Sequence, residues 1–478
     1  MSNAKQLSAR ERINILLDDN SFVEIGELVN ARSTDFNMSV KETPADGVVT
    51  GYGVVDGNLV YVYSQDVTVM NGSVGEMHAK KITKIYDLAL KVGAPVVGLI
   101  DCAGMRLQEA TDALNAFGEL YFKQTLASGV IPQITAIFGT CGGGVAMIPA
   151  LTDFTFMTKD NSKLFVNTPN ALDGNEISKC NTSSAVYQSE TAGNVDSMGE
   201  DDADVLASIR DLLSYLPMNN EDDASFDECF DDLNRENEVL ASVKDTAYIL
   251  GDIADDGRFF EVKKDFAKEM VTGLLKLNGA TVGAVANRTE LLGDDGEVAQ
   301  SFDGMLTTDG AYKAAEFVDF CDAFGIPVLS LVDVKGFRAT VEEEKTIARA
   351  CAKLTYAFAS ATVPKVSVII GQAFGSAYIA MNSKHIGADM VYAYDTAEIG
   401  MMNSKSAAKI MYSGEELSVI NEKAAEYAQL QTSPLSAAKR GYVDNIISAA
   451  ATRKYVIGAF EMLYTKREER PSKKHGTV

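Results

Sequence analysis

Two glycine-rich segments are the residues of this chain that could do chemistry through their backbone. They read "GTCGGGVAMIP", from Gly139, and "GQAFGSAYIAM", from Gly371, and each follows an apolar run and precedes a helix-like one. Backbone N–H groups at such a turn can donate hydrogen bonds to an oxygen that gains negative charge during a reaction. Alternatively, the glycines only let a helix pack closely on a strand. The spacing alone leaves both interpretations open.

Side chains that usually carry catalysis are scarce. The chain has three histidines, His78, His385 and His475, and no Gly-x-Ser-x-Gly turn that would expose a nucleophilic serine. No cysteine and histidine cluster has metal-site spacing, so no metal is expected. Chemistry here would depend on backbone donors more than on a side-chain base, which suits enolate chemistry on a thioester.

Motifs for nucleotide phosphates are not found. There is no Walker A segment and no dinucleotide-binding glycine fingerprint. The Ala-Met-Lys-Met quartet that carries covalent biotin is also missing. We therefore expect no biotin attached to this chain.

Composition narrows the classes of partner. The 478 residues carry 43 Lys and Arg against 67 Asp and Glu, a net charge of −24, which repels nucleic acid and anionic membranes. We expect no nucleic-acid partner. The six cysteines lack short metal-type spacings and read as reduced thiols of a cytoplasmic protein. The N-terminal segment has no signal-peptide pattern, and no apolar run reaches 18 residues.

The chain repeats itself at an offset of 232 residues. "DLALKVGAPVVGLIDCAGMR", from Asp87, corresponds to "DFCDAFGIPVLSLVDVKGFR", from Asp319. In each copy a helix pattern ends at a glycine, and a short β-branched strand and a Gly–Arg loop follow. A helix, a second strand beginning at a proline and the glycine-rich turn come next. Strands that alternate with helices predict βαβ units and an α/β fold with two homologous lobes.

The lobes are predicted to begin with β-rich segments and to be separated by an acidic stretch. Asp56-Gly57 and Asn278-Gly279 have the composition of hairpin turns. Residues 170–237 are acidic and include a predicted helix at about 202–215. We place the boundary near 236–245, which gives an N-terminal lobe of 1–240 and a C-terminal lobe of 241–478.

Over nearly its whole length the sequence resembles the carboxyltransferase subunits of biotin-dependent acyl-CoA carboxylases and decarboxylases, the group of propionyl-CoA carboxylase β and methylmalonyl-CoA decarboxylase α. The segments that carry the resemblance include "DGVVTGYGVVDGNLVYVYSQD", "GSVGEMHAKKI", "LASGVIPQITAIFG" and "TRKYVIGAFEMLYTKREERPSKKHG". The resemblance implies two crotonase-like (ClpP/crotonase) lobes in tandem. The N-terminal lobe would face acyl-CoA, and the C-terminal lobe would face carboxybiotin.

The resemblance also implies an activity and partners. A carboxyl group would pass between biotin, on a separate biotin carboxyl carrier protein, and the α-carbon of a small acyl-CoA such as propionyl-CoA or methylmalonyl-CoA. An enolate would be held in two oxyanion holes. The subunits would form a homo-oligomer, a hexamer, with each active site between lobes of neighbouring subunits. Further partners would be biotin carboxylase or the subunits of a membrane decarboxylase, to which a cytoplasmic chain would attach.

Matching by position gives the candidate site residues. The first hole would come from Gly104, Met105, Gly143 and Gly144. The second hole would come from Gly336, Phe337, Gly375, Ser376 and Ala377. The substrate-binding residues would be Arg106, Gln108 and Ile379.

The second lobe departs from the family pattern. It has "VKGF" where the family has Val-Pro-Gly-Phe, and "RATVEEEKTIARACAKL" where the family has a glycine-rich loop. In the first lobe, "NALDGNEISKCNTSSAV" after Pro169 also departs from the family's acyl-site region. Together these departures concern the biotin site and the acyl specificity. Two alternatives stay open: the β subunit of an ATP-driven propionyl- or acetyl-CoA carboxylase, and a non-catalytic paralogue that scaffolds a carboxyltransferase complex.

Overall fold

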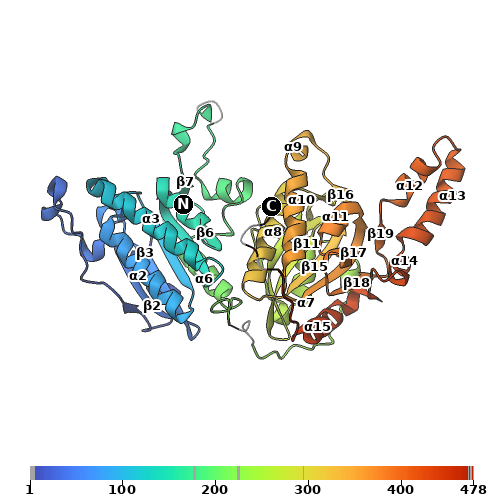
Figure 1. Ribbon diagram of the computed structural model, residues 1–478, viewed down its shortest axis with the longest axis horizontal. Coiled ribbons are helices and arrows are strands. Elements are labelled where there is room, and N and C mark those ends of the chain that lie inside the picture. Colours follow the sequence, from blue (N-terminus) through green and yellow to red (C-terminus); the bar gives the residue numbers. More distant parts are fainter. Residues whose placement is uncertain are drawn as a thin grey trace. The chain divides into compact units, whose positions relative to one another are not determined.

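The computed structural model describes residues 6–175, 179–222, 227–293, 295–471, 473 and 476. The chain divides into two compact units, Met1–Asp223 and Ala224–Val478. Each unit is a mainly parallel sheet with helices on both faces (Figure 1). The predicted α/β class and the two lobes are confirmed. His475 lies outside the described residues.

The division between the units comes before the boundary expected near 236–245. The residues that follow position 226 already bond to the second unit. Asp227 N–H donates to the Gly279 carbonyl at 2.9 Å, and Asn237 N–H donates to the Ala450 carbonyl at 3.2 Å. The acidic stretch 170–237 was expected to separate the lobes, whereas the backbone at Asp227 and Asn237 is bonded to the second unit.

The sheet of the first unit has the strand order β1-β2-β3-β4-β5-β6-β8, with β7 paired to β5. The hairpin β2–β3 turns at Asp56-Gly57 as predicted, and the strands from β3 onward run parallel. The strands are β1 (Val23–Glu24), β2 (Val48–Val55), β3 (Asn58–Gln65), β4 (Val96–Cys102), β5 (Gln133–Gly142), β6 (Phe154–Thr158), β7 (Lys163–Phe165) and β8 (Ser197–Gly199).

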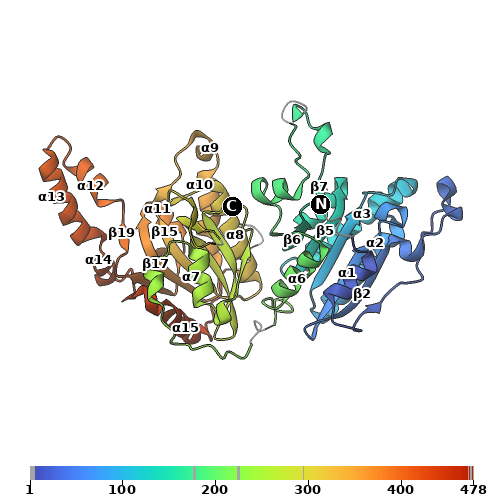
Figure 2. The same cartoon turned by 180° about the vertical axis from the view of Figure 1, so that it is seen from behind.

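Helices cover both faces of this sheet. Helices α2 (Glu76–Val92) and α3 (Ala110–Ala127) lie side by side on the face nearer the viewer in Figure 1. Helices α1 (Ala9–Leu16) and α6 (Asp202–Leu213) pack together on the other face (Figure 2). The short α4 (Met147–Ala150) follows β5.

Helix α2 shows how the sequence specifies these elements. Its apolar residues recur at helical spacing and are buried in the core, which forms the face packed on the sheet. It ends at Gly93, whose φ of +66° belongs to the left-handed region that glycine adopts without strain. Its beginning, at Glu76, lies beside the loop that follows β4, and this makes the helix relevant to the site.

The second unit repeats the plan with the order β20-β18-β17-β15-β11-β10-β9, and β19 pairs with β17. Its strands are β9 (Phe259–Val262), β10 (Met270–Leu277), β11 (Ala280–Asn287), β15 (Val328–Val334), β17 (Lys365–Phe374), β18 (Met390–Tyr394), β19 (Glu398–Gly400) and β20 (Asn445–Ile447). Shorter strands are β12 (Glu290–Leu292), β13 (Val298–Ser301), β14 (Met305–Leu306) and β16 (Gly336–Phe337).

Helices α8 (Thr308–Ala323) and α10 (Ile347–Ser360) pack side by side on one face of this sheet (Figure 1). Helices α7 (Thr246–Ile253) and α15 (Thr452–Leu463) contribute to the core with β10 and β11. Two short helices, α9 (Val341–Glu344) and α11 (Gly375–Ala380), follow β16 and β17.

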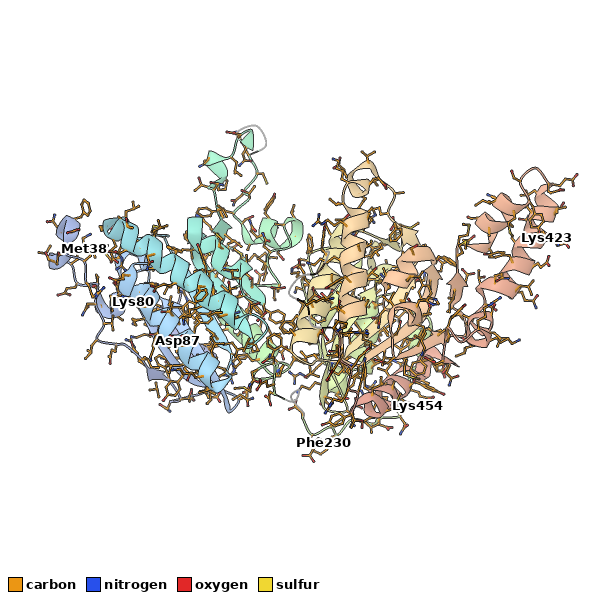
Figure 3. The ribbon with its side chains drawn as sticks, viewed as in Figure 1. Met38, Lys80, Asp87, Phe230, Lys423 and Lys454 are labelled. Atoms are coloured by element: carbon orange, nitrogen blue, oxygen red, sulfur yellow. The ribbon has the colours of Figure 1, made fainter. Side chains whose placement is uncertain are left out.

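A helical hairpin extends from the second unit between β19 and β20. It consists of α12 (Ser404–Met411) packed against α13 (Leu417–Tyr427), and α14 (Pro434–Lys439) leads back to the sheet (Figure 1). Lys423, labelled in Figure 3, lies on α13 and forms an ion pair with Glu426 at 2.7 Å. The sequence repeat did not predict this hairpin.

The repeat itself appears in the structure without a change of register. Adding the offset of 232 residues to the first and last residues of β4 and β5 gives the first and last residues of β15 and β17. Both strand pairs also carry an irregularity at the equivalent place, between Ile100 and Cys102 and between Val332 and Val334. Among the described residues no helix is both long and apolar enough to cross a membrane.

Candidate active site

In the first unit, two glycine-containing loops meet where β4 and β5 end. Cys102 pairs with Cys141 across the two strands. A Cβ placed on Gly139 would overlap the Asp101 carboxylate, so this glycine is needed for close packing. The two loops lie side by side: a Cβ built on Gly104 would be only 3.7 Å from the Gly142 carbonyl oxygen. Both proposed segments of the first hole therefore lie at one edge of the sheet.

The loop after β4 forms a parallel bridge between its residue Met105 and Val74. Val74 N–H donates to the Gly104 carbonyl, and Arg106 N–H donates to the Val74 carbonyl, both at 2.9 Å. In such a bridge the groups that flank Met105 bond to Val74, and the N–H of Met105 itself points to the opposite side. Gly104 N–H instead donates to Cys102 Sγ at 3.3 Å. Of the two donors predicted in this loop, Met105 is therefore the one whose N–H is not engaged by Val74 or Cys102.

Gly143 and Gly144 open the turn after β5. Gly143 has a φ of +63°, and a Cβ there would meet nothing within 4 Å. Close packing therefore does not require glycine at 143, whereas the left-handed backbone does. The first N–H groups of a helical turn have no acceptor within it, so the turn Gly143–Ala146 presents donors at this edge. Tyr121 Oη donates to the Gly144 carbonyl at 2.6 Å and fixes the turn.

Arg106 was predicted to bind substrate, but its side chain is fully buried. Nη1 contacts Asp46 Oδ1 at 2.6 Å and Glu109 Oε1 at 2.8 Å, and Nη2 donates to the Ser73 carbonyl at 2.9 Å. A guanidinium engaged in this way has no exposed edge to offer a ligand. Arg106 is therefore a supporting residue of the loop and not a substrate contact in this structure.

The two carboxylates that bind Arg106 also accept hydrogen bonds from the first turn of α2. Glu109 Oε2 accepts from Glu76 N–H at 2.6 Å, and Asp46 Oδ2 accepts from His78 N–H at 2.7 Å. Burial raises the pKa of Asp46, and Arg106 opposes that rise. Burial lowers the pKa of His78 to about 3, so its imidazole is neutral and is not an acid catalyst.

The neutral His78 ring continues the network toward both loops. Its Nδ1 lies 3.0 Å from the Asp46 carbonyl, and its Nε2 lies 3.2 Å from Gln65 Nε2. Gln65 Oε1 accepts from Asp101 N–H at 3.2 Å, and Asp101 Oδ1 accepts from Thr140 N–H at 3.4 Å. The ends of β4 and β5 are thus joined to the start of α2.

The second unit repeats the layout at the ends of β15 and β17. Val334 pairs with Ala373, and Asp333 Oδ1 accepts from Gln372 N–H at 2.8 Å. Strand β16 runs parallel to β14, and Arg338 N–H donates to the Leu306 carbonyl at 2.9 Å. This bond matches the one from Arg106 to Val74. Phe337 N–H therefore faces away from Leu306, as Met105 N–H faces away from Val74.

The turn after β17 begins at Gly375. Its φ is +61°, and a Cβ there would lie 3.3 Å from the Met401 carbonyl oxygen. Ser376 is exposed and Ala377 is buried. Helix α11 contacts β16, so all five residues predicted for the second hole lie on two adjacent segments.

The other two predicted substrate-binding residues lie near these loops. Gln108 is half-buried in the turn Leu107–Glu109. Ile379 is 37% exposed on α11. Both stay predictions. Among the described residues no group of three or more histidine, cysteine and acidic side chains is arranged to hold a metal ion.

Sequence reasoning missed the residues that support the first loop. Asp46 lies 60 positions before its partner Arg106, and a glycine-rich motif gives no indication of that contact. Cys102 was interpreted only as a reduced thiol, although its Sγ accepts the Gly104 N–H. The repeat offers one sequence signal: at the offset of 232 residues Glu109 corresponds to Val341, so this acidic partner of the arginine occurs in only one of the two copies.

The arrangement has known relatives. Residues 2–478 match the family described as the carboxyl transferase domain. The chain belongs to the carboxyl transferase family. It is 42% identical to methylmalonyl-CoA decarboxylase subunit alpha of Veillonella parvula, over 99% of this chain and 93% of that protein. It is 41% identical to the propionyl-CoA carboxylase beta chain of Roseobacter denitrificans, over 99% and 94% of the two chains.

Solved structures agree with this assignment. Transcarboxylase 12S, a hexamer determined with hydrolysed methylmalonyl-coenzyme A bound, has 38% sequence identity and a TM-score of 0.92. The match covers 99% of this chain and 92% of that one. The resemblance noted from the sequence is confirmed, as are the crotonase-like lobes. The carboxyltransferase is a biotin-dependent acyl-CoA enzyme of the propionyl-CoA carboxylase β and methylmalonyl-CoA decarboxylase α type.

Proposed function

We propose that this carboxyltransferase moves a carboxyl group between biotin on a separate carrier and the α-carbon of a small acyl-CoA, through an enolate. The observation that carries the proposal is the repeated donor arrangement. In each unit the loop after one central strand carries an N–H group that points away from its bridge partner, that of Met105 in the first unit and that of Phe337 in the second. Beside it, at the same edge of the sheet, a glycine turn presents further N–H groups. Two such sets suit a reaction in which two carbonyl oxygens gain charge.

The first set is assigned to the acyl-CoA. Removing or adding a carboxyl group at the α-carbon places negative charge on the thioester oxygen. The N–H groups of Met105, Gly143 and Gly144 would stabilise that oxygen, and each oxyanion donor contributes about 3 kcal/mol to the transition state. Methylmalonyl-CoA bound to transcarboxylase 12S supports propionyl-CoA and methylmalonyl-CoA as the substrate pair.

The second set is assigned to biotin. Its donors are neutral backbone N–H groups, and glycine at 336, with a φ of +154°, adds no Cβ beside them. This chemistry fits the carbonyl oxygen of a cyclic urea, which biotin has. When bound, biotin supplies the group that carries the carboxyl between proteins. The chain's own part is to orient the urea through Phe337, Gly375 and Ser376.

We further propose a hexamer that works in the cytoplasm with a biotin carboxyl carrier protein. Its other partners are a biotin carboxylase or the subunits of a membrane decarboxylase. The hexamer of transcarboxylase 12S supports the oligomer. The free state of the six cysteines supports a reducing compartment. Identities of 42% and 41% to a decarboxylase and a carboxylase subunit do not separate the two settings.

Carboxyl exchange tests the function. Purified protein is incubated with free biotin and, in separate reactions, malonyl-CoA, methylmalonyl-CoA and glutaconyl-CoA, and loss of the carboxyl group is followed by mass spectrometry. We expect exchange with at least one of the three. Binding of acyl-CoA with no exchange in any reaction would favour the scaffolding alternative.

A further inference from the structure

We propose that Arg106, with Asp46 and Glu109, is a positioning group for the first oxyanion hole. It fixes the backbone from Gly104 to Arg106 so that Met105 N–H faces the thioester oxygen. The proposal rests on the proposed function, because it assigns a role within that same site.

Arg106 holds the Ser73–Val74 segment at two points. Its main-chain N–H donates to the Val74 carbonyl at 2.9 Å. Its side chain reaches Ser73, the residue before Val74. Nη2 donates to the Ser73 carbonyl at 2.9 Å, and Nε lies 3.4 Å from Ser73 Oγ. The bridge between Val74 and Met105 is thereby fixed by backbone and side chain of one residue. Because this bridge sets which way Met105 N–H points, Arg106 controls the direction of the donor.

Each carboxylate bridges Arg106 to the first turn of α2. Asp46 uses Oδ1 for Arg106 Nη1, at 2.6 Å, and Oδ2 for His78 N–H. Glu109 uses Oε1 for Arg106 Nη1, at 2.8 Å, and Oε2 for Glu76 N–H. Helix α2 is packed along the core of the unit, so the loop takes its position from a rigid element.

The side chains of Arg106, Asp46 and Glu109 are tightly packed and leave no room beside Gly75 for a further atom. A Cβ on Gly75 would lie 2.6 Å from Arg106 Nη1 and 2.6 Å from each carboxylate oxygen of Glu109. The side chains of Arg106 and Asp46 are 0% exposed, and that of Glu109 is 2% exposed. A shorter cation at 106 would leave some of these acceptors unpaired and let the loop shift.

Stability alone gives little reason for such a cluster. Buried ion pairs are often no more stabilising than apolar packing, because both charges lose their hydration. The second unit also satisfies the start of its long helix without its equivalent arginine: Glu343 accepts from Thr308 N–H at 2.8 Å, while the Arg338 side chain is 35% exposed. The second unit therefore holds its equivalent donor, Phe337, without a buried arginine at this place, and we assign the cluster in the first unit to fixing the acyl-CoA donor, Met105, more tightly.

The test pairs two conservative substitutions, Arg106→Lys and Arg453→Lys. Arg453 is an equally buried arginine in the second unit, outside both predicted holes. It contacts Asp255 Oδ1 at 2.7 Å and donates to the carbonyls of Ile253 at 2.6 Å and Asp232 at 3.1 Å. Both substitutions should lower the melting temperature by similar amounts. Only Arg106→Lys should lower the kcat of carboxyl exchange, by about 10²-fold, because a misplacement near 1 Å has that effect.

The KM for acyl-CoA should change little in Arg106→Lys, because the arginine does not touch the ligand. Equal kcat values for the two variants would overturn the proposal. Should Arg106→Lys fail to fold, Glu109→Gln and its control Asp255→Asn make the same comparison, since each removes one carboxylate charge from a buried arginine. A wild-type protein without exchange would instead overturn the proposed function, and this proposal with it.

Discussion

The starts of α2 and α8 are equivalent positions in the two units, and they are stabilised differently. At α2, the buried carboxylates of Asp46 and Glu109 accept from first-turn N–H groups and also pair with the buried Arg106. At α8, the Thr307 hydroxyl accepts from Gly310 N–H at 2.9 Å and Glu343 accepts from Thr308 N–H. Both arrangements fold the same element. The two arrangements therefore differ in how they hold the adjacent loop. In the first unit the buried side chain of Arg106 anchors the loop after β4, whereas in the second unit the side chain of Arg338 is partly exposed.

What the units share makes this contrast informative. Lys81 and Lys313 are equivalent in the two repeats, and each donates to a backbone carbonyl of a turn earlier in the chain. Lys81 Nζ lies 2.8 Å from the Ala45 carbonyl oxygen. Lys313 Nζ lies 2.7 Å from the Lys263 carbonyl oxygen. Burial lowers the pKa of Lys81 to about 8 and that of Lys313 to about 7. The two units therefore share this lysine contact, whereas only the first has a buried arginine pairing with carboxylates at the start of its long helix.

The largest difference is expected between Arg106→Ala and Arg338→Ala. Removing Arg106 leaves two buried carboxylates without their cation, which should lower the free energy of unfolding by about 3–5 kcal/mol. Arg338 is 35% exposed and pairs with the 52% exposed Asp303 at 3.3 Å, so its loss should cost less than about 1 kcal/mol. Urea denaturation of both variants measures this. Similar losses would remove the distinction between the loops.

The glycine turns should respond alike in both units, since the donors are duplicated. Gly143→Val and Gly375→Val should each lower the turnover of carboxyl exchange by about 10²–10³. The control is Gly57→Val: its φ is +82° and a Cβ there meets nothing within 4 Å, so it has the backbone strain of Gly143 in a distant hairpin. Wild-type turnover in Gly143→Val, with melting like that of the control, would reject the oxyanion role.

A smaller contrast concerns Asp153 and Asp389, which each accept a strand N–H at equivalent places, from Gln133 at 2.7 Å and Lys365 at 2.8 Å. Burial raises the pKa of Asp153 to about 7. The folded state therefore holds a proton that the unfolded state loses near pH 4. Stability should fall between about pH 4 and pH 7, by up to about 1.4 kcal/mol per pH unit.

Asp153→Asn should remove that slope and raise stability at pH 8, because the amide oxygen still accepts the Gln133 N–H. Asp389→Asn should not gain in this way, since Asp389 Oδ2 lies 2.8 Å from Lys466 Nζ. Denaturation midpoints of both variants and the wild type, measured from pH 4 to pH 8, make the comparison. A wild-type slope that persists in Asp153→Asn would contradict the assignment.

The smallest effect is expected from Glu343→Gln. The amide oxygen can still accept from Thr308 N–H, so the loss is the interaction of a negative charge with the start of the helix, about 0.3–1 kcal/mol. Glu109→Gln should cost more, because it also disturbs a buried arginine. Chemical denaturation at low salt shows the difference, and added salt should reduce only the Glu343→Gln effect.

The sequence predicted the strands and hairpin turns of both units well, because these depend on residue types and spacings within short segments. Strands β4 and β15 occupy the predicted apolar runs, and the hairpin turns fall at Asp56-Gly57 and Asn278-Gly279. It could not predict contacts between distant residues, such as Arg106 with Asp46, because periodicity reports burial of a face and not its partners. The same limit applies to the acidic stretch 170–237, whose composition gave no indication that Asp227 and Asn237 bond to the second unit.

The proposed reacting donors are main-chain groups, and this has a consequence for how the enzyme can change. Every residue except proline presents the same N–H, so Met105 and Phe337 can occupy equivalent places with unrelated side chains. Selection then acts on backbone direction and leaves side-chain identity free to adjust the shape of the pocket. Such a site tolerates drift that would destroy a catalytic triad, and alanine scanning would pass over Met105 and Phe337 without revealing them.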